Sequence, residues 1–167
     1  MPGCEVTSGT LGHGLSVGVG LALAAQRRRT GQRCYALVGD GEINEGAIWE
    51  ALMFAAHARL SDLMVIVDAN GFQAMGTTDE VMALGDIAAR FTAFGFDALT
   101  VDGHDMDGIS AAIGDLQSRA NGRPKALVAR TVKGKGVSYM ENDNRWHYLR
   151  LTPELYAQAL RELEATA

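Results

Sequence analysis

Residues 39–73 read GDGEINEGAIWEALMFAAHARLSDLMVIVDANGFQ. This stretch predicts a strand that ends in a Gly-Asp-Gly turn, then a helix, then a second apolar strand that is followed by Asn70. Asp40 and Asn70 lie 30 positions apart (70 − 40), which is about the length of one strand–helix–strand unit. Because neighbouring parallel strands end at the same edge of a sheet, we expect both residues at the edge where open α/β sheets bind ligands.

The residue types at this edge indicate a magnesium-bound diphosphate. Gly41 has no Cβ, so its backbone N–H can approach a phosphate oxygen closely. Asp40 offers a carboxylate and Asn70 an amide oxygen, and Mg²⁺ prefers such oxygen ligands together with phosphate oxygens and water. We expect the carbonyl of Phe72 to complete the protein ligands. Gly-Asp-Gly alone is also a common strand-to-helix turn, and the dinucleotide pattern GxGxxG is not met.

The rest of the chain alternates between strand and helix patterns. Strands of five or six residues separated by helices predict an α/β fold, a doubly wound parallel sheet with helices on both faces. A small-residue helix near the N-terminus needs close packing to persist, because each glycine lowers helix propensity. The expected strands are residues 34–38, 63–68, 97–101 and 125–130; the expected helices are residues 12–29, 45–59, 86–94, 106–120 and 153–164, with a polar connection beginning at 79–82.

Length and composition predict one soluble domain over residues 1–167. Hydrophobic residues make up 47% and charged residues 21% of the 167 residues, and the net charge is −5, which argues against disorder and against a nucleic-acid or anionic-membrane partner. Cys4 and Cys34 show no zinc-type spacing. No stretch reaches the roughly 18 apolar residues of a membrane span, and the N-terminus lacks a signal-peptide pattern. We therefore expect a cytoplasmic protein.

Five motifs together resemble the diphosphate-binding domain of transketolases, within the thiamine-diphosphate-dependent enzymes. The likeness is closest to the amino-terminal subunit of split transketolases and covers nearly the whole chain. The motifs are SGTLGHGLSVGVGLALA (8–24), GDGEINEGAIWEA (39–51), DLMVIVDANGFQ (62–73), AFGFDALTVDGHD (93–105) and RTVKGKGVSYMENDNRWH (130–147).

The resemblance implies a cofactor site for thiamine diphosphate and Mg²⁺. It assigns the metal to Asp40, Asn70 and the Phe72 carbonyl, and it assigns a loop lining the cofactor to Gly9, Leu11 and Gly12. The residues expected to bind the cofactor are Gly9, Leu11, Gly12, Gly39, Asp40, Gly41, Glu42, Asn70 and His147. Glu42 is counted with the turn that it follows, although its side chain is expected to face solvent.

Glu45 and His147 are the implied catalytic residues. Glu45 matches a glutamate in a proton relay at the subunit interface, and Glu50 matches a second interface glutamate. From the residues alone, the alternative is that they are two solvated helix acids. His147 matches a histidine near the diphosphate that assists proton transfer. His13 lines the site or packs at a helix start, whereas His57 and His104 are expected to be structural or turn residues.

The implied activity is transfer of a two-carbon ketol group from a ketose to an aldose by a transketolase-type enzyme. The substrates would be phosphorylated or related sugars. The aminopyrimidine of the cofactor would be activated by a separate pyrimidine-domain subunit, in a heterotetramer or dimer of heterodimers. The alternatives are another thiamine-diphosphate-dependent lyase or synthase subunit, and a non-catalytic cofactor-binding or assembly module.

The sequence departs from the family pattern in three places. Relatives carry a further segment before the SGTLGHG motif, and its apparent lack here makes activity without a partner doubtful. Tyr148 follows His147 where the family usually has glycine, and Ala74-Met75 stand where many relatives have Ile-Asp. The last difference places a thioether near the expected cofactor wall and suggests an altered substrate choice.

Overall fold

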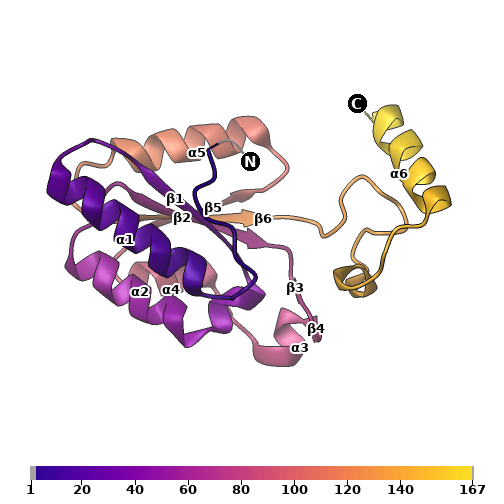
Figure 1. Cartoon of the computed structure of the whole chain (residues 1–167), viewed down its shortest axis with the longest axis horizontal. Coiled ribbons are helices and arrows are strands. Elements are labelled where there is room, and N and C mark those ends of the chain that lie inside the picture. The colour runs from indigo at the N-terminus through magenta and orange to yellow at the C-terminus, as the bar shows by residue number, and fades with distance from the viewer. Residues whose placement is uncertain (1–2, 167) are drawn as a thin grey trace.

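A four-stranded parallel sheet forms the centre of the protein. The computed structural model describes residues 3–166. The sheet order is β1–β2–β6–β5, and all three strand pairings are parallel (Figure 1). The strands are β1 (Cys34–Gly39), β2 (Leu63–Ala69), β5 (Asp97–Asp102) and β6 (Lys125–Arg130). The predicted parallel α/β architecture is therefore confirmed.

Helices cover the two faces of the sheet unequally. Three of them lie on one face, and α5 lies on the other (Figure 1). The three are α1 (His13–Arg28), α2 (Gly46–His57) and α4 (Ile87–Ala93), and α5 spans Met106–Ser118. Their bounds agree with the predicted ranges to within a few residues. None of the helices within residues 3–166 combines the length and the apolar character needed to cross a membrane.

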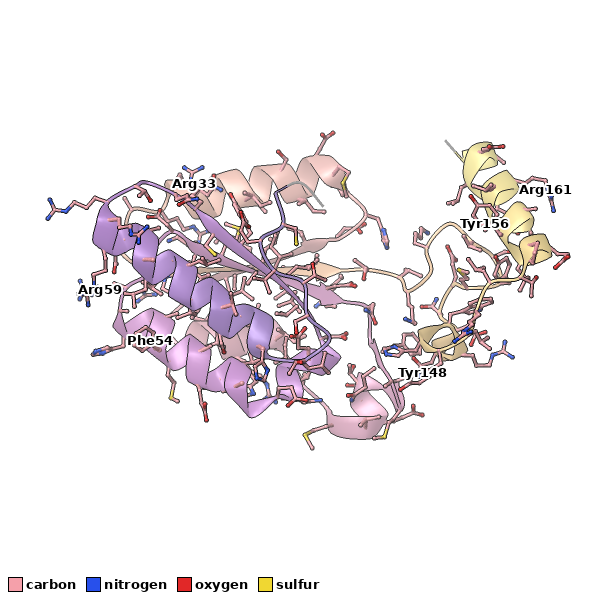
Figure 2. All side chains as sticks on the ribbon, viewed as in Figure 1. Arg33, Phe54, Arg59, Tyr148, Tyr156 and Arg161 are labelled. Atoms are coloured by element: carbon pink, nitrogen blue, oxygen red, sulfur yellow. The ribbon has the colours of Figure 1, made fainter. Side chains whose placement is uncertain are left out.

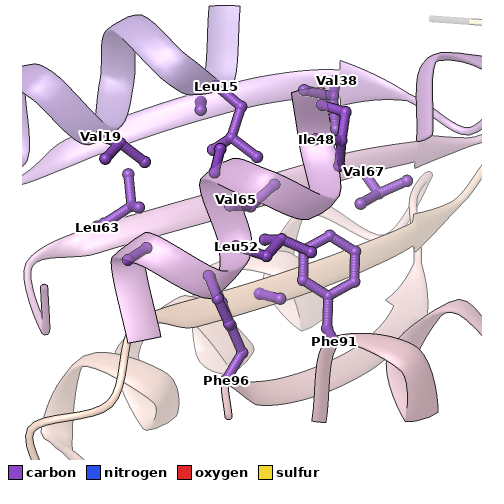
Figure 3. Close-up of a cluster of buried hydrophobic side chains, with 14 of the residues drawn as sticks. Leu15, Val19, Val38, Ile48, Leu52, Leu63, Val65, Val67, Phe91 and Phe96 are labelled. Atoms are coloured by element: carbon purple, nitrogen blue, oxygen red, sulfur yellow. The ribbon is translucent and has the colours of Figure 1, made fainter. Parts of the chain in front are cut away.

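The main hydrophobic core lies between the sheet and the three helices (Figure 3). Strand β2 supplies Leu63, Val65 and Val67 to this core, and all three are fully buried. Helix α1 packs closely on β1. A Cβ added at Gly18 would lie only 3.4 Å from the Cβ of Ala36, so the absence of a side chain at this position allows the close approach. This contact explains how a glycine-rich helix persists. On the opposite face, Gln117 of α5 donates to the hydroxyl of Tyr35 in β1, while Leu37 further along β1 is 72% exposed.

The connection after β2 differs from the prediction. Residues 79–82, where a polar connection was expected to begin, belong to the helix α3 (Thr78–Met82). A hairpin that was not predicted precedes it, formed by β3 (Phe72–Gln73) and β4 (Gly76–Thr77). The helix forms because Thr77 and Glu80 make a capping box, in which each side chain accepts from the other residue's backbone N–H. Two-residue strands are too short to show an alternating pattern, so this hairpin leaves no periodic trace in the sequence.

The last part of the chain leaves the sheet after β6. Its loop contains a 3₁₀ turn, η2 (Asn144–His147), and leads to α6 (Pro153–Thr166). Figures 1 and 2 show this segment lying to one side of the sheet, with Tyr148 and Tyr156 on it. The Oγ1 of Thr152 accepts the N–H of Leu155 at 3.3 Å, as expected for a helix N-cap.

Candidate functional site

Asp40 and Asn70 lie at the same edge of the sheet, as predicted. Gly39 at the end of β1 is paired with Asp68 in β2. The N–H of Asp40 then donates to the carbonyl of Asp68 at 3.1 Å, which prolongs the pairing by one step. The two predicted metal ligands therefore extend from neighbouring strands at their carboxyl ends, where open α/β sheets bind ligands.

Asp40 is a buried carboxylate, with only 3% of its surface exposed. Its Oδ1 accepts the N–H of Gly41 at 2.8 Å, and its Oδ2 accepts the N–H of Gly71 at 2.6 Å. Burial raises the pKa of Asp40 above its ordinary value of 3.8, the charge of Asp68 adds to this rise, and the two N–H donors oppose it. A buried carboxylate with a raised pKa is stabilised in its charged form by a cation, so the position suits a metal ligand.

Asn70 shapes the loop that would present the Phe72 carbonyl. Its Oδ1 accepts the N–H of Phe72 at 2.9 Å, and its Nδ2 donates to Oδ2 of Asp68 at 3.2 Å. Asp68 is in turn held through its Oδ1 by a short hydrogen bond from the hydroxyl of Thr131. The Asn70 oxygen keeps a second lone pair for a metal ion. The two hydrogen bonds of Asn70 thus fix the orientation of its side-chain amide without a bound ligand.

Gly41 is required by the packing of the turn. A Cβ added at Gly41 would lie 2.5 Å from the Cβ of Gln73 and 3.4 Å from its Oε1. The hairpin therefore closes directly over the Gly-Asp-Gly turn, and any larger residue would push the two apart.

Glu42 does not face solvent, so this expectation was wrong. Its Oε1 accepts the N–H of Gly12 at 2.8 Å, and its Oε2 accepts the N–H of Gly39 at 3.2 Å. The carboxylate thus ties the start of α1 to the end of β1. Gly12 is buried, with φ at 80°, a conformation that favours glycine. Glu42 brings the end of the Gly9–Gly12 loop to the Gly-Asp-Gly turn.

Glu45 stands at the N-cap of α2 with an exposed side chain that makes no capping hydrogen bond. The site of a Cβ on Gly12 is 3.2 Å from the Cβ of Glu45, so this glutamate borders the same loop. Glu50, one and a half turns further along α2, is also exposed. Both carboxylates are therefore open to a partner chain, and neither is committed to a contact within residues 3–166.

His147 lies on the turn η2, which is in contact with β3, the short strand that begins two residues after Asn70. The His147 side chain is exposed, and its ring stacks edge-on against Tyr148 with centroids 5.0 Å apart. Gly9 and Leu11 are also exposed.

The remaining histidines are His13, His57 and His104. His13 is exposed, with Nδ1 3.1 Å from the carbonyl of Leu11. His57 is exposed in the last turn of α2. His104 is a turn residue, as expected, and its Nε2 accepts the N–H of Val132 at 2.8 Å. It thereby fixes the start of the loop that leads to η2.

The donor set at this edge fits Mg²⁺. Within residues 3–166, no group of three or more His, Cys, Asp or Glu side chains is placed to hold a metal by itself. Magnesium does not need such a group, because it is usually bound by one or two protein carboxylates together with phosphate oxygens and water. One buried carboxylate, one oriented amide oxygen and a loop carbonyl are consistent with that pattern.

Sequence reasoning missed four polar residues at this edge: Asp68, Gln73, Thr131 and Asn144. Asp68 is a charged residue in an apolar strand, and this could have pointed to it. The others carry no such sign, because their partners are distant in sequence.

A cavity of about 330 Å³ also lies at this edge, lined in part by Ala69, Thr100 and Arg130.

Fold and site together define a class: an α/β protein with a ligand site at the carboxyl ends of two adjacent parallel strands, equipped with an acid, an amide and a glycine turn. The chain belongs to the family described as the transketolase thiamine diphosphate binding domain, which it matches over residues 1–163. The resemblance inferred from the five motifs is therefore confirmed.

Individual relatives agree with this membership. The chain is 45% identical over 163 residues to one subunit of the apulose-4-phosphate transketolase of Phocaeicola vulgatus, covering 98% of this chain and 58% of the relative. It is 40% identical over 162 residues to a 6-deoxy-6-sulfo-D-fructose transketolase subunit of a Clostridium species, covering 97% and 58%. The crystal structure of Campylobacter jejuni transketolase matches with a TM-score of 0.88 and 28% identity, covering 97% of this chain and 26% of that one. The chain thus spans little more than half the length of the two related subunits.

Proposed function

We propose that this chain is the diphosphate-binding part of a transketolase-type enzyme that transfers a two-carbon ketol group with thiamine diphosphate and Mg²⁺. The observation that carries the proposal is the preorganised edge formed by Asp40, Asn70 and Gly41 in a chain of this family. When bound, the cofactor supplies a nucleophilic carbon that accepts the ketol unit from a ketose and passes it to an aldose.

The residues of the edge anchor the cofactor by its charged end. Asp40, the Asn70 oxygen and the Phe72 carbonyl would hold Mg²⁺, and the Gly-Asp-Gly turn, in which the N–H of Gly41 is donated to Asp40, would lie next to the diphosphate. Glu42 holds the Gly9–Gly12 loop against the turn through its bond to Gly12. These contacts orient the cofactor and do not take part in bond making.

Proton transfer falls to two exposed residues at the margins of the site. In this proposal His147 exchanges a proton with a substrate hydroxyl, and the contact of its turn η2 with β3 supports that role. Glu45 opens toward a partner chain and serves a proton relay there. Both side chains face solvent within residues 3–166, and the carboxylate of Glu45 is not used to cap its own helix.

A pyrimidine-domain subunit completes the enzyme in this proposal. Two relatives are named as transketolase subunits, which supports a divided enzyme. The outer faces of α1 and α2 support burial against another chain, because Leu21, Met53 and Phe54 are 45%, 56% and 47% exposed. The proposed assembly is a dimer of heterodimers. The proposed substrates are sugars with an anionic group, since the two relatives are named for a phosphorylated and a sulfonated sugar.

Calorimetric titration of the chain with thiamine diphosphate, with and without Mg²⁺, tests the site. Binding should require Mg²⁺ and should be lost in Asp40→Ala. Asp40→Asn is a second variant of the same size: it keeps one acceptor oxygen but no charge, so metal-dependent binding should fall about tenfold or more, and its melting curve checks that the fold persists. Unchanged binding by Asp40→Ala would refute the site.

Activity is tested separately, by adding the partner that carries the pyrimidine domain and following ketol transfer from a phosphorylated ketose to an aldose. Cofactor binding without transfer in the complete assembly would favour the non-catalytic module instead. Decarboxylation or condensation of a keto acid by the same assembly would favour another thiamine-diphosphate-dependent enzyme.

A further inference from the structure

Two buried polar atoms lack a hydrogen-bond partner among the described residues: Nε2 of Gln73 and Oδ1 of Asn144. Buried side-chain polar atoms are normally paired, because leaving one unpaired costs its full desolvation penalty. Such exceptions therefore call for a specific explanation. Neither residue belongs to the ligand set inferred from the sequence.

Gln73 lies directly on the Gly-Asp-Gly turn. Its Cβ is 2.5 Å from where a Cβ of Gly41 would be, and its Oε1 is 3.4 Å from the same point. Gly41 belongs to the turn proposed to lie next to the diphosphate, and its own N–H is donated to Asp40. The side chain of Gln73, which carries the unpaired Nε2, therefore packs against that turn.

Asn144 is the first residue of η2, and η2 lies against β3, the strand that holds Gln73. The turn is held firmly: Asp143 accepts the N–H of Arg145 at 3.0 Å, and Nε1 of Trp146 donates to the carbonyl of Tyr139 at 2.7 Å. Asn144 is thus fixed by its neighbours while its own oxygen stays unpaired. One free donor and one free acceptor lie on two elements in contact.

We infer that Gln73 and Asn144 contact the diphosphate–magnesium unit, an inference that rests on the proposed function. Gln73 donates its N–H to a phosphoryl oxygen. Asn144 accepts a hydrogen bond from a water molecule that Mg²⁺ retains, since this ion usually keeps several waters. Both unpaired atoms are then satisfied by the same ligand.

This pairing has a consequence for His147, which lies in the same four-residue turn as Asn144. Ligand binding fastens η2 to β3 through both amides. The loaded cofactor thereby holds His147 in place beside the site.

The test uses the full chain and the variant Gln73→Met, which keeps the length of the side chain and removes the donor. At saturating Mg²⁺, calorimetry should show thiamine diphosphate binding about tenfold weaker or more, as for a lost hydrogen bond to a charged group. The ligand-free melting temperature should stay level or rise, because an unpaired buried amide has been removed. Gln117→Met, at the other end of the sheet, is the control and should bind like the parent.

Inorganic diphosphate with Mg²⁺ separates the two parts of the cofactor. Because the contact is to the phosphoryl group, Gln73→Met should weaken its binding by the same factor. A loss seen only with thiamine diphosphate would overturn the inference, since the amide would then contact the organic part.

Asn144→Leu tests the acceptor, with hydrogen exchange as a readout independent of activity. In the parent, residues 131–147 should gain protection when the ligand binds, and both variants should lose most of that gain. If the parent binds the cofactor while both variants bind within about twofold of it and keep the gain, the inference fails and the proposed function stands. If the parent itself does not bind, both fail.

Discussion

The sheet and the segment after β6 are built in different ways. The sheet encloses a continuous core, and its site residues are held by hydrogen bonds within the chain, as Asp40 is by Gly41 and Gly71. The segment 132–166 is held largely by hydrogen bonds within itself, such as those from Ser138 to Glu162 and from Trp146 to Tyr139. Several of its apolar side chains are exposed, namely Tyr148, Leu149, Leu151, Tyr156, Leu160 and Leu163.

This difference separates two tasks. The proposed anchor for the charged end of the cofactor is formed by contacts within the chain, so it can be tested on the chain alone. The part that carries His147 is left open to solvent, where a further chain can cover it. Substitutions in the two regions should therefore have separable effects, and the following predictions run from the largest expected effect to the smallest.

Removal of Asp97 should destabilise the sheet most. Its Oδ2 accepts from Nζ of Lys125 at 2.7 Å, and the side chains of Asp97 and Lys125 are only 8% and 3% exposed. Asp97→Ala leaves a buried cation without its counter-charge, which costs about 3–5 kcal/mol of unfolding free energy. Asp115→Ala is the control, because its pair with Arg119 is exposed and worth at most about 1 kcal/mol. Urea unfolding measures both, and equal losses would contradict the prediction.

The same pair predicts a pH dependence. Burial would raise the pKa of Asp97, but hydrogen bonds from Lys125 and Asn121 outweigh it and hold the pKa below 3.8. A lowered pKa in the folded state adds stability above pH 3.8 that is lost as the pH falls through the folded value. The difference in unfolding free energy between the parent and Asp97→Ala should therefore become smaller below pH 3.8. A difference that does not change with pH would show that the charge of Asp97 is not its cause.

Loss of the Glu42 carboxylate should lower both the stability of the fold and the affinity of the proposed site, with a smaller loss of stability than in Asp97→Ala. Glu42→Ala removes the acceptor for the N–H groups of Gly12 and Gly39, which should cost about 1–3 kcal/mol. Thiamine diphosphate affinity should fall as well, because the Gly9–Gly12 loop is released. Glu50→Ala is the control: its side chain is exposed on α2, so both the melting temperature and the affinity measured by calorimetry should be unchanged.

Trp146→Phe should loosen the segment after β6 and spare the sheet. The ring remains, but the N–H bond to Tyr139 is lost, at a cost of about 1 kcal/mol. Limited proteolysis within 131–148 should accelerate by a factor of about five, with the main melting transition unchanged. Trp49→Phe, in the core helix α2, should not alter that cleavage rate, and if it does, the two regions are not independent.

Tyr148→Gly should have the smallest effect on the isolated chain. The Tyr148 side chain is 73% exposed, so its removal should change stability by about 0.5 kcal/mol or less. With the proposed pyrimidine-domain subunit present, the Michaelis constant for the proposed sugar substrate should change instead, because Tyr148 adjoins His147, the residue proposed to contact the substrate. A large change in melting temperature of the chain alone would show that Tyr148 packs within it.

Much of the fold follows from patterns visible in the sequence. Residues 63–68 are a short apolar run bounded by polar residues, which predicts a buried strand, and the structure has Leu63–Ala69. Asp40 and Asn70 come directly after their strands, so parallel pairing of the two strands is enough to predict that both residues lie at the same edge of the sheet. The hairpin at Phe72–Gln73 could not be predicted in this way, because it is made by a turn and by contact with Gly41.

The sequence by itself therefore determined the parallel sheet, its ligand edge and the family of the chain, because each depends on spacing along one or two adjacent elements. Only the tertiary structure decided that Glu42 turns inward to hold Gly12, and that Gln73 and Asn144 present unpaired atoms on touching elements. Such contacts join residues 30 or more positions apart. Whether two such groups meet depends on how whole elements pack, and local residue pattern does not record it.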